Sequence, residues 1–425
     1  MAVETTAPSV SDLCRAAKAA ARSLAATDSA TRDGALLAMA GALEARSDEI
    51  LEANARDLEA GRESGLSAAL MDRLALDEGR IAAMAAGVRA IVALPDPVGE
   101  VIDGHRLPNG LDVRKVRVPL GVVAVVYEAR PNVTIDAAAL CLKSGNAVLL
   151  RGSSSAAHSN AVLAAVAREA VEAAGLVPGA LSLVAGGGRD ELAELAGQEG
   201  LVDLIIPRGG EGLKKALSAV AKVPVIYAAS GNCHVYVDAS ADLEMAEQIV
   251  VNAKVQRPGV CNAAETLLVH EAAAEAFLPR AVRALRSHGV QLRAEPRARA
   301  AAGSEGSGLV DATEEDFAEE FLALIMAVKV VGSVDEAIEH VNAYGSGHSE
   351  AIVTSDFAAA RAFQTSVDAA CVYVNASTRF TDGGEFGMGA EIGNSTQKLH
   401  ARGPIGLREL CTFKYLVDGT GQVRG

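Results

Sequence analysis

Apolar residues recur at helical spacing along the first part of the chain. This spacing is found in the segments DLCRAAKAAARSLAA and TRDGALLAMAGALEARSDEILEANARDLEAG, and Ser and Thr residues lie near the expected helix starts. The pattern predicts helices over residues 9–93. A polar, alternating segment follows at 100–119, and the turn signal Pro108-Asn109-Gly110 divides it. This predicts a hairpin that has little core of its own and needs another surface to pack on.

The next part of the chain alternates apolar segments with helical ones. The apolar segments predict strands at 121–128, 146–152, 181–187, 202–209 and 223–229. The helical pattern lies between them, at 135–145, 157–175, 189–197 and 212–222. Continuous apolar strands that alternate with helices predict a parallel, doubly wound sheet covered on both faces. Ligands bind such sheets at the carboxyl ends of strands, which here read ARPN, RGSS, AGGG and PRGG.

A second α/β set follows. It predicts strands at 233–239, 265–271, 328–333, 350–356 and 371–377. We expect residues 295–308 to form a loop. The chain closes with a Gly-rich stretch at 380–393, and residues 406–419 can form a strand that pairs with the hairpin. The fold class is therefore α/β, with a doubly wound parallel sheet, a second α/β domain and a small β element.

Length and composition fit this organisation. The 425 residues are too many for one ordinary core and favour two domains. A net charge of -15 gives no general attraction for nucleic acid or for anionic membranes. The chain has no apolar run of membrane-spanning length and no secretory signal, so neither a span nor export is expected. Its six cysteines form no C-x-x-C pair, which argues against a metal site and favours a reducing cytoplasm.

One cysteine stands out by its position. Cys261 lies in the loop RPGVCN, between a helix and a strand, and Pro-Gly holds it on a turn. Most cysteines are small core residues, and Cys141 and Cys371 fit that description because they lie within apolar runs. Cys261 is a candidate nucleophile. Its position alone leaves both interpretations open.

Two loops after strands offer further polar groups. Asn132, in Ala-Arg-Pro-Asn, is either part of an ordinary turn or the donor of a hydrogen bond to an oxyanion. In the second loop, Ser153 and Ser154 follow Arg151 and Gly152 at a helix start, where small residues and hydroxyls can hold a phosphate. Neither loop is the G-x-G-x-x-G fingerprint, so the motif alone does not predict a dinucleotide site.

Together these loops resemble the aldehyde dehydrogenase superfamily, and within it the reductases of acyl phosphates. The resemblance covers nearly the whole chain. Its most specific strings are VYEARPNVTIDAAALCLKSGNAVLLRG, SGNCHVYVD, QRPGVCNAAETLLV, AYGSGHSEAIVT, VYVNASTRFTDGGEFGMGAEIG and STQKLHARGPIGL. It implies an aldehyde-dehydrogenase-like fold with the following parts: a helical lead-in and part of the cofactor domain (1–100), an oligomerisation hairpin (101–120), an NADP-binding domain (121–232), a catalytic domain (233–376), and a Gly-rich return segment to the cofactor domain with a C-terminal oligomerisation strand (377–425).

The resemblance also assigns roles to individual residues. It implies that Cys261 forms a thioester and that Asn132 and the Cys261 N–H form the oxyanion hole. Arg151 falls where relatives place a Lys on the adenosine ribose, and Glu320 aligns with the acid that holds the nicotinamide ribose. The alternative for Glu320 is a solvated helix residue. The expected NADP(H) site is completed by Ser153, Ser154, Gly209 and Gly210.

The preference for NADP over NAD follows from one position. Ser154 falls where NAD-preferring relatives often carry a Glu, and a carboxylate there would repel a 2′-phosphate. The chain departs from its relatives at Tyr227-Ala228-Ala229, where many carry Glu-Thr-Gly, and at Ala323, where we expect an Asp. No carboxylate remains at 227–229 to activate water, which counts against a hydrolytic aldehyde oxidase.

The reaction that the resemblance implies is the NADPH-dependent reduction of L-glutamyl 5-phosphate to L-glutamate 5-semialdehyde and phosphate. This is the second step of proline biosynthesis from glutamate. We expect the substrate's amino-acid head and phosphate to be held by residues of the most specific strings: Asn232, Ser377, Arg379, Lys398 and His400. The alternative for Arg379 and Lys398 is ordinary surface charge. His234, on an apolar strand, fits a core or supporting histidine better than a catalyst.

Two other functions stay open at this stage. One is a different aldehyde or acyl dehydrogenase, such as a CoA-acylating one, and the other is a non-catalytic dinucleotide-binding protein. The partners expected are the small-molecule substrate, further copies of the chain in a homo-oligomer, and a glutamate 5-kinase.

Overall fold

The structure is a computed structural model that describes residues 8–186, 188–227 and 231–425. The chain divides into two compact units. The first holds the residues up to 227 together with Gly387–Gly393 and Ile405–Gly425, and the second holds 231–386 and Asn394–Pro404. The roles assigned to the sequence domains, in cofactor binding, catalysis and oligomerisation, stay predictions.

Helices begin the first unit, as the sequence predicts. Each of four helix starts is capped by a short polar side chain, and Ser9 forms a capping box with Asp12. Helix α2 packs on α5 and on α7 through a buried apolar stripe that includes Leu36, Met39 and Leu43. The helices are α1 (Val10–Leu24), α2 (Ser29–Ala45), α3 (Ser47–Glu63), α4 (Ala68–Leu74) and α5 (Glu78–Val92), with α7 (Ala157–Ala173) further along the chain.

A parallel sheet of four strands forms the core of the first unit, in the order β5-β4-β3-β6. Strand β3 is buried along its whole length, as its continuous apolar sequence predicts. The strands are β3 (Val122–Tyr127), β4 (Ala147–Arg151), β5 (Leu181–Leu183) and β6 (Leu204–Arg208). The other helices are α6 (Asn132–Lys143), the short η1 (Ser154–Ala156), α8 (Arg189–Ala196) and α9 (Glu211–Val220).

Two strand predictions in this sheet need correction. The strand expected at 181–187 ends at Leu183. The strand expected at 223–229 is reduced, among the described residues, to one isolated parallel bridge between Ile205 and Val225. Pro224 removes a backbone donor there, which limits further pairing.

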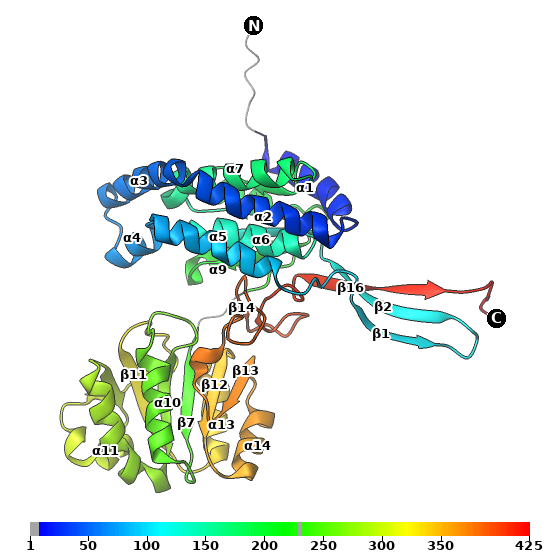
Figure 1. Ribbon diagram of the computed structural model, residues 1–425. Helices are drawn as coiled ribbons and strands as arrows, with labels where there is room; N and C mark the ends of the chain where they lie inside the picture. The colour runs from blue at the N-terminus through cyan, green and yellow to red at the C-terminus, as the bar shows by residue number, and fades with distance from the viewer. Residues whose placement is uncertain (1–7, 187, 228–230) are drawn as a thin grey trace. The chain divides into compact units, whose positions relative to one another are not determined.

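The polar hairpin forms and gains a third strand. Strands β1 (Val101–Arg106), β2 (Asp112–Pro119) and β16 (Cys411–Asp418) lie side by side in that order, and β16 pairs antiparallel with β2 (Figure 1). The prediction that the C-terminal strand joins the hairpin is confirmed. Gly110, with a φ of 89°, supplies the left-handed turn residue that the hairpin needs.

The second unit is built on a sheet of seven parallel strands, in the order β10-β9-β11-β8-β7-β12-β13. Alternate side chains enter two separate apolar clusters. Val235 and Val237 of β7 join the cluster of α10 and α11, and Tyr236 joins the cluster of α13 and α14. Helices therefore cover both faces of the sheet.

The elements of this unit have the following bounds. The strands are β7 (Cys233–Val237), β8 (Ala264–His270), β9 (Gln291–Ala294), β10 (Val310–Asp311), β11 (Ile325–Val331), β12 (Ser349–Val353) and β13 (Cys371–Val374). The main helices are α10 (Leu243–Val255), α11 (Glu271–Ser287), α13 (Val334–Tyr344) and α14 (Phe357–Ser366). Short elements are η3 (Glu315–Phe317), η4 (Thr378–Phe380), β14 (Asn394–Ser395) and β15 (Gly403–Pro404).

The prediction that residues 295–308 form a loop is wrong. The segment contains α12 (Pro296–Ala301) and η2 (Gly303–Gly306). The Glu295 side chain accepts hydrogen bonds from the N–H groups of Arg297 and Ala298, and Pro296 takes the first helical position, where its missing N–H costs nothing. The short strands β9 and β10 on either side of this segment were not predicted.

Candidate active site

Cys261 is the most accessible thiol of the chain. It lies in the loop between α10 and β8 and is half-buried, whereas the other five cysteines are buried. Burial raises the pKa of the Cys14 thiol to about 11, so such a thiol is protonated and inert near neutral pH. Only Cys261 thus combines a thiol with access for a reagent, which favours the nucleophile over the core interpretation.

The backbone of Cys261 is held from two sides within the second unit. Its carbonyl oxygen accepts a hydrogen bond from Sγ of Cys233 at 3.2 Å. A Cβ atom on Gly231 would lie 1.6 Å from the same oxygen, so no larger residue fits at 231 in this arrangement. These contacts fix the nucleophile loop against the start of β7.

Glu320 is connected to the same place. Its Oε1 accepts a hydrogen bond from the N–H of Gly231 at 2.6 Å. Glu320 lies in the loop between η3 and β11 and is half-buried, so the alternative of a solvated helix residue is wrong. Its contact with the nicotinamide ribose stays a prediction. Because Gly231 also approaches Cys261, it links the Glu320 carboxylate to the nucleophile loop.

A buried ion pair joins the helix before the nucleophile loop to the strand after it, and it was not predicted from the sequence. Lys254 of α10 and Glu265 of β8 are both fully buried and form a salt bridge. Burial raises the pKa of the Glu265 carboxyl to about 7, against the opposing effect of Lys254. The Oε1 atom of Glu265 also accepts from the Leu322 N–H at 3.3 Å. Charged residues inside otherwise apolar elements are the signal that predicts such a pair.

Ser377 and Arg379, two of the predicted substrate residues, lie beside the nucleophile loop. Asn262, the residue after Cys261, connects the two segments. Its Nδ2 donates to the carbonyl oxygen of Thr381 at 3.0 Å, and its backbone carbonyl oxygen accepts from Thr378 Oγ1 at 2.7 Å. Ser377 is buried and caps η4 by accepting from the Arg379 N–H at 3.3 Å. The structure therefore brings residues 377–381 to the residue that follows Cys261.

Asn232 and His234 are engaged inside the protein. Asn232 is buried, and its Nδ2 donates to the carbonyl oxygens of Phe317 at 2.7 Å and Tyr344 at 2.9 Å. Its Oδ1 has no partner among the described residues, so a substrate role for Asn232 stays a prediction. His234 is fully buried, with Nδ1 2.9 Å from Oε2 of Glu350. This agrees with the interpretation of His234 as a core histidine.

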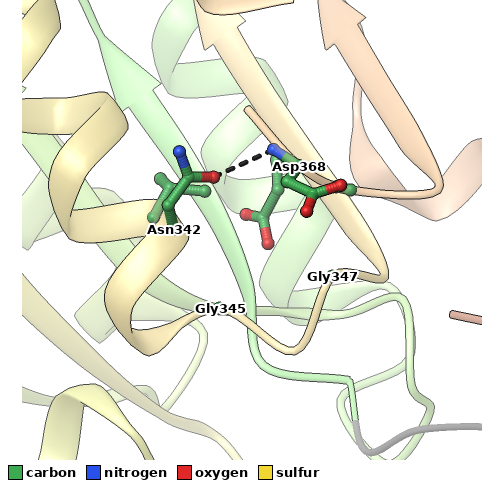
Figure 2. A pocket seen from close by; sticks show the side chains of 7 residues that line it. Asn342, Gly345, Gly347 and Asp368 are labelled. Carbon is green, nitrogen blue, oxygen red and sulfur yellow. Dashed lines mark hydrogen bonds between the residues drawn. The ribbon is translucent and has the colours of Figure 1, made fainter. Parts of the chain in front are cut away.

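Lys398 binds a residue that lines a small cavity. It forms a salt bridge with Asp368, which also binds Arg402 at 2.9 Å. Asp368 lines the cavity of about 270 Å³ in Figure 2, and its N–H donates to Oδ1 of Asn342 at 2.9 Å. His400 is exposed. The substrate roles of Lys398 and His400 stay predictions.

Five of the predicted cofactor residues lie at the carboxyl ends of β4 and β6 in the first unit, whereas Glu320 belongs to the second unit. Ser153 Oγ accepts from the Ala129 N–H at 3.1 Å, which links the loops after β4 and β3. Arg151 is buried and donates to the Gly188 carbonyl oxygen at 2.6 Å. Ser154 begins η1 and is exposed.

Two glycines complete this edge of the sheet. Gly209 and Gly210 are exposed after β6, and the Gly210 N–H donates to Oε2 of Glu128 at 3.1 Å. The Ser153 and Ser154 hydroxyls and the Arg151 guanidinium at this edge suit a phosphate-bearing cofactor.

Asn132 is the first residue of α6 and is exposed. Its Nδ2 donates to Oδ2 of Asp136 at 2.9 Å, and burial raises the pKa of Asp136. An amide nitrogen has two hydrogens, so one stays free for an oxyanion. Asn132 belongs to the first unit and Cys261 to the second, and the oxyanion hole that joins them stays a prediction. Of the altered segment 227–229, Ala228 and Ala229 lie outside the described residues.

The described residues include neither a metal-binding cluster nor a membrane-spanning helix. No cluster of three or more His, Cys, Asp or Glu side chains in this part of the chain could hold a metal ion. No helix among the described residues is both long and apolar enough to cross a membrane.

Known proteins resemble the chain over nearly its whole length. The model of the aldehyde dehydrogenase family matches residues 2–302 and 309–414. A gamma-glutamyl phosphate reductase of Heliobacterium modesticaldum is 57% identical over 408 residues, which are 96% of this chain and 97% of that protein. The crystal structure of gamma-glutamyl phosphate reductase from Thermotoga maritima superimposes with a TM-score of 0.96 at 46% identity, covering 98% of this chain and 100% of that one.

More distant structures share the fold alone. An acetylating aldehyde dehydrogenase from Geobacillus thermoglucosidasius is 21% identical, with a TM-score of 0.69 over 98% of this chain and 97% of that one. The predicted aldehyde-dehydrogenase-like α/β fold is confirmed. The chain is an oxidoreductase that belongs to the aldehyde dehydrogenase family and, within it, to the gamma-glutamyl phosphate reductases.

Proposed function

We propose that the enzyme reduces L-glutamyl 5-phosphate to L-glutamate 5-semialdehyde and phosphate, with NADPH as the reductant and a thioester on Cys261. The observation that carries the proposal is the position of Cys261, the one thiol of six that is not buried, on a loop fixed by Gly231 and Cys233. The names of its close relatives support the same substrate.

The thiolate of Cys261 attacks the acyl carbon, and the C–O bond to phosphate breaks with its electron pair on the leaving phosphate. Covalent catalysis of this kind divides one difficult step into two easier ones. The thioester carbonyl then accepts a hydride, the C–S bond breaks, and the aldehyde leaves as the thiolate is restored. Asn132 and the Cys261 N–H stabilise the oxyanion in both halves.

Members of this family use a nicotinamide dinucleotide, which supplies the hydride when it is bound. The residues at the carboxyl ends of β4 and β6 fit such a group, because Ser153 and Ser154 bring hydroxyls to the start of η1 and Gly210 lies at the start of α9. Ser154 is exposed and uncharged, so no carboxylate at that position repels a 2′-phosphate. This supports NADP over NAD.

Phosphate, rather than water, is the second nucleophile in the reverse direction. The sequence at 227–229 is Tyr-Ala-Ala and holds no carboxylate that could activate water. A general base for hydrolysis is therefore absent from that segment, which an acyl-phosphate reductase does not need.

The same proposal covers the setting of the enzyme. We place the reaction in proline biosynthesis, in a cytoplasm that keeps the six cysteines reduced. The enzyme acts as a homo-oligomer, and a glutamate 5-kinase that makes the unstable acyl phosphate is the expected partner.

The test is an assay of glutamate semialdehyde oxidation with NADP and phosphate. We expect activity that requires phosphate or arsenate, is weaker with NAD, and is lost in Cys261→Ser and Cys261→Ala. Cys371→Ser, at a buried thiol, serves as the control and keeps its activity. Full activity of the Cys261 variants would contradict the thioester, and a requirement for CoA instead of phosphate would favour a CoA-acylating dehydrogenase.

A further inference from the structure

The guanidinium of Arg379 reaches across the nucleophile loop. Its Nε donates to Oε1 of Gln256 at 2.8 Å, five residues before Cys261. Its backbone carbonyl oxygen lies 3.4 Å from Nδ2 of Asn262, the residue after Cys261. Arg379 therefore contacts both ends of the loop, with its side chain at the residue before Arg257 and with its backbone at the residue after Cys261.

A second cation lies in the same loop. Arg257 is exposed, and neither Arg257 nor Arg379 has a carboxylate within salt-bridge distance among the described residues. Burial and the like charge of Arg257 lower the pKa of Arg379, whereas the Cys261 thiol acts on it in the opposite direction. Arg257 and Arg379 thus bring two positive charges to the loop that carries the thiol, and no salt bridge within the described part of the chain neutralises either of them, which favours the binding of an anion there.

We propose that Arg257 and Arg379 form an anion subsite beside Cys261, which receives the phosphate group of the acyl phosphate. This rests on the proposed function and deepens it by assigning the leaving group to two named residues. No other function is proposed for Arg257. Guanidinium groups suit phosphate because their N–H donors match its oxygens in pairs.

The subsite acts at two stages of the reaction. In the free enzyme the positive charges stabilise the Cys261 thiolate over the thiol, which supplies the activation that a nucleophilic cysteine needs. As the thiolate attacks and the C–O bond breaks, the departing phosphate gains the negative charge that the thiolate loses, and the same two cations hold it. In the reverse direction they hold the phosphate that attacks the thioester.

Other titratable groups lie near the loop. Negative charge comes from Asp382, which acts on Arg379, and from Glu320, which binds the Gly231 N–H. The buried Lys254 and Glu265 largely compensate each other. The remaining titratable neighbour is the buried thiol of Cys233, whose pKa burial raises well above its usual value. Arg257 and Arg379 are thus the cations that decide the local charge.

The test measures the alkylation of Cys261 by iodoacetamide in the full-length enzyme without cofactor, followed by peptide mass spectrometry. The rate is compared with and without inorganic phosphate at constant ionic strength. We expect phosphate to slow labelling of the unaltered enzyme. Arg379→Gln should label about tenfold more slowly without phosphate, as for a thiol pKa one unit higher, and lose the protection by phosphate. Arg257→Gln should show the same losses to a smaller extent.

Two variants serve as comparisons. Arg379→Lys keeps the charge and should retain part of the protection, which separates the anion site from a folding defect. Arg280→Gln removes an arginine paired with Glu247 at 2.7 Å, remote in sequence from the loop, and should label like the unaltered enzyme.

The proposal is overturned if phosphate leaves the labelling rate of the unaltered enzyme unchanged, or if Arg379→Gln is protected as well as the unaltered enzyme. In activity assays, Arg379→Gln should raise the KM for phosphate more than it lowers kcat. An enzyme with phosphate-dependent activity whose labelling ignores phosphate contradicts the subsite alone. An enzyme without that activity contradicts the proposed function, whatever the labelling shows.

Discussion

Gly231 approaches Cys261 so closely that a Cβ atom on residue 231 would lie 1.6 Å from the Cys261 carbonyl oxygen. Gly231→Ala therefore cannot fold without moving the nucleophile loop, since the contacting atom belongs to the backbone. We expect a loss of activity of about 100-fold or more, as follows from a misplaced catalytic group. The measurements are kcat with semialdehyde, NADP and phosphate, and the rate at which Cys261 reacts with iodoacetamide.

Gly41→Ala is the matched control for this substitution. Gly41 lies within α2, and nothing lies within 4 Å of the Cβ atom it would gain. Alanine there should stabilise the enzyme by up to about 1 kcal/mol and leave kcat unchanged. Normal activity and labelling in Gly231→Ala would show that the loop adapts without cost and that the contact does not position the thiol.

Asp136 should position the oxyanion donor Asn132. Its Oδ2 accepts from Asn132 Nδ2 at 2.9 Å, which orients the amide and leaves one hydrogen for the substrate. Asp136→Ala should lower kcat about tenfold with little change in KM, whereas Asn132→Ala removes the donor itself and should cost about 100- to 1000-fold.

The conservative variant separates positioning from folding. Asp136→Asn keeps an oxygen that can accept from Asn132 and should recover most of the kcat that Asp136→Ala loses. Equal kcat values for Asp136→Ala and the unaltered enzyme would mean that Asn132 does not depend on Asp136.

The sequence predicts those parts of the fold that follow from apolar runs. Strands β3 and β7 are continuous apolar segments between helical ones, and both were expected. Strand β9 reads QLRA, and its polar residues carry no strand signal, because its place depends on pairing with β11. The helix α12 lies in the segment predicted as a loop, although proline, which stands at its first position, is favourable there.

The site shows a similar division. Cys261 and Asn132 were found through motifs, whereas the buried pair of Lys254 and Glu265 joins a helix to a strand and needs the fold to be recognised. Asp136 could have been found, because residues four apart on a helix face each other. The contact between Gly231 and Cys261 joins two loops distant in sequence, and no spacing rule predicts it.

Acid should destabilise the fold through a buried histidine. His348 is fully buried, and burial lowers its pKa from 6.5 to about 4. Below pH 6.5 the unfolded chain binds a proton that the folded state excludes, so the stability present above 6.5 is lost as the pH falls toward 4. The loss is about 1.4 kcal/mol per pH unit. Urea unfolding midpoints at neutral and mildly acidic pH measure it.

His348→Asn should make that pH dependence shallower, because asparagine does not titrate and its oxygen can replace Nδ1, which lies 2.8 Å from Ser349 Oγ. His340, whose pKa burial lowers to about 3, keeps its own contribution. His288→Asn is the control at an exposed histidine and should leave the pH dependence as it is. An unchanged slope in His348→Asn would exclude His348 as a source of acid sensitivity.

The hairpin sheet carries an exposed apolar stripe that should hold the oligomer together. Phe413, Tyr415 and Val417 alternate along β16 and therefore share one face, with exposed fractions of 46%, 59% and 53%. A row of exposed large apolar side chains on one strand is typical of a surface that another subunit covers.

Tyr415→Asp puts a charge into this stripe and should reduce the mass of the assembly measured by light scattering. Thr412→Asp places the same charge on the other face of β16 and should leave the mass unchanged. Equal masses for Tyr415→Asp and the unaltered enzyme, or a loss of assembly in Thr412→Asp alone, would rule out this face as the subunit contact.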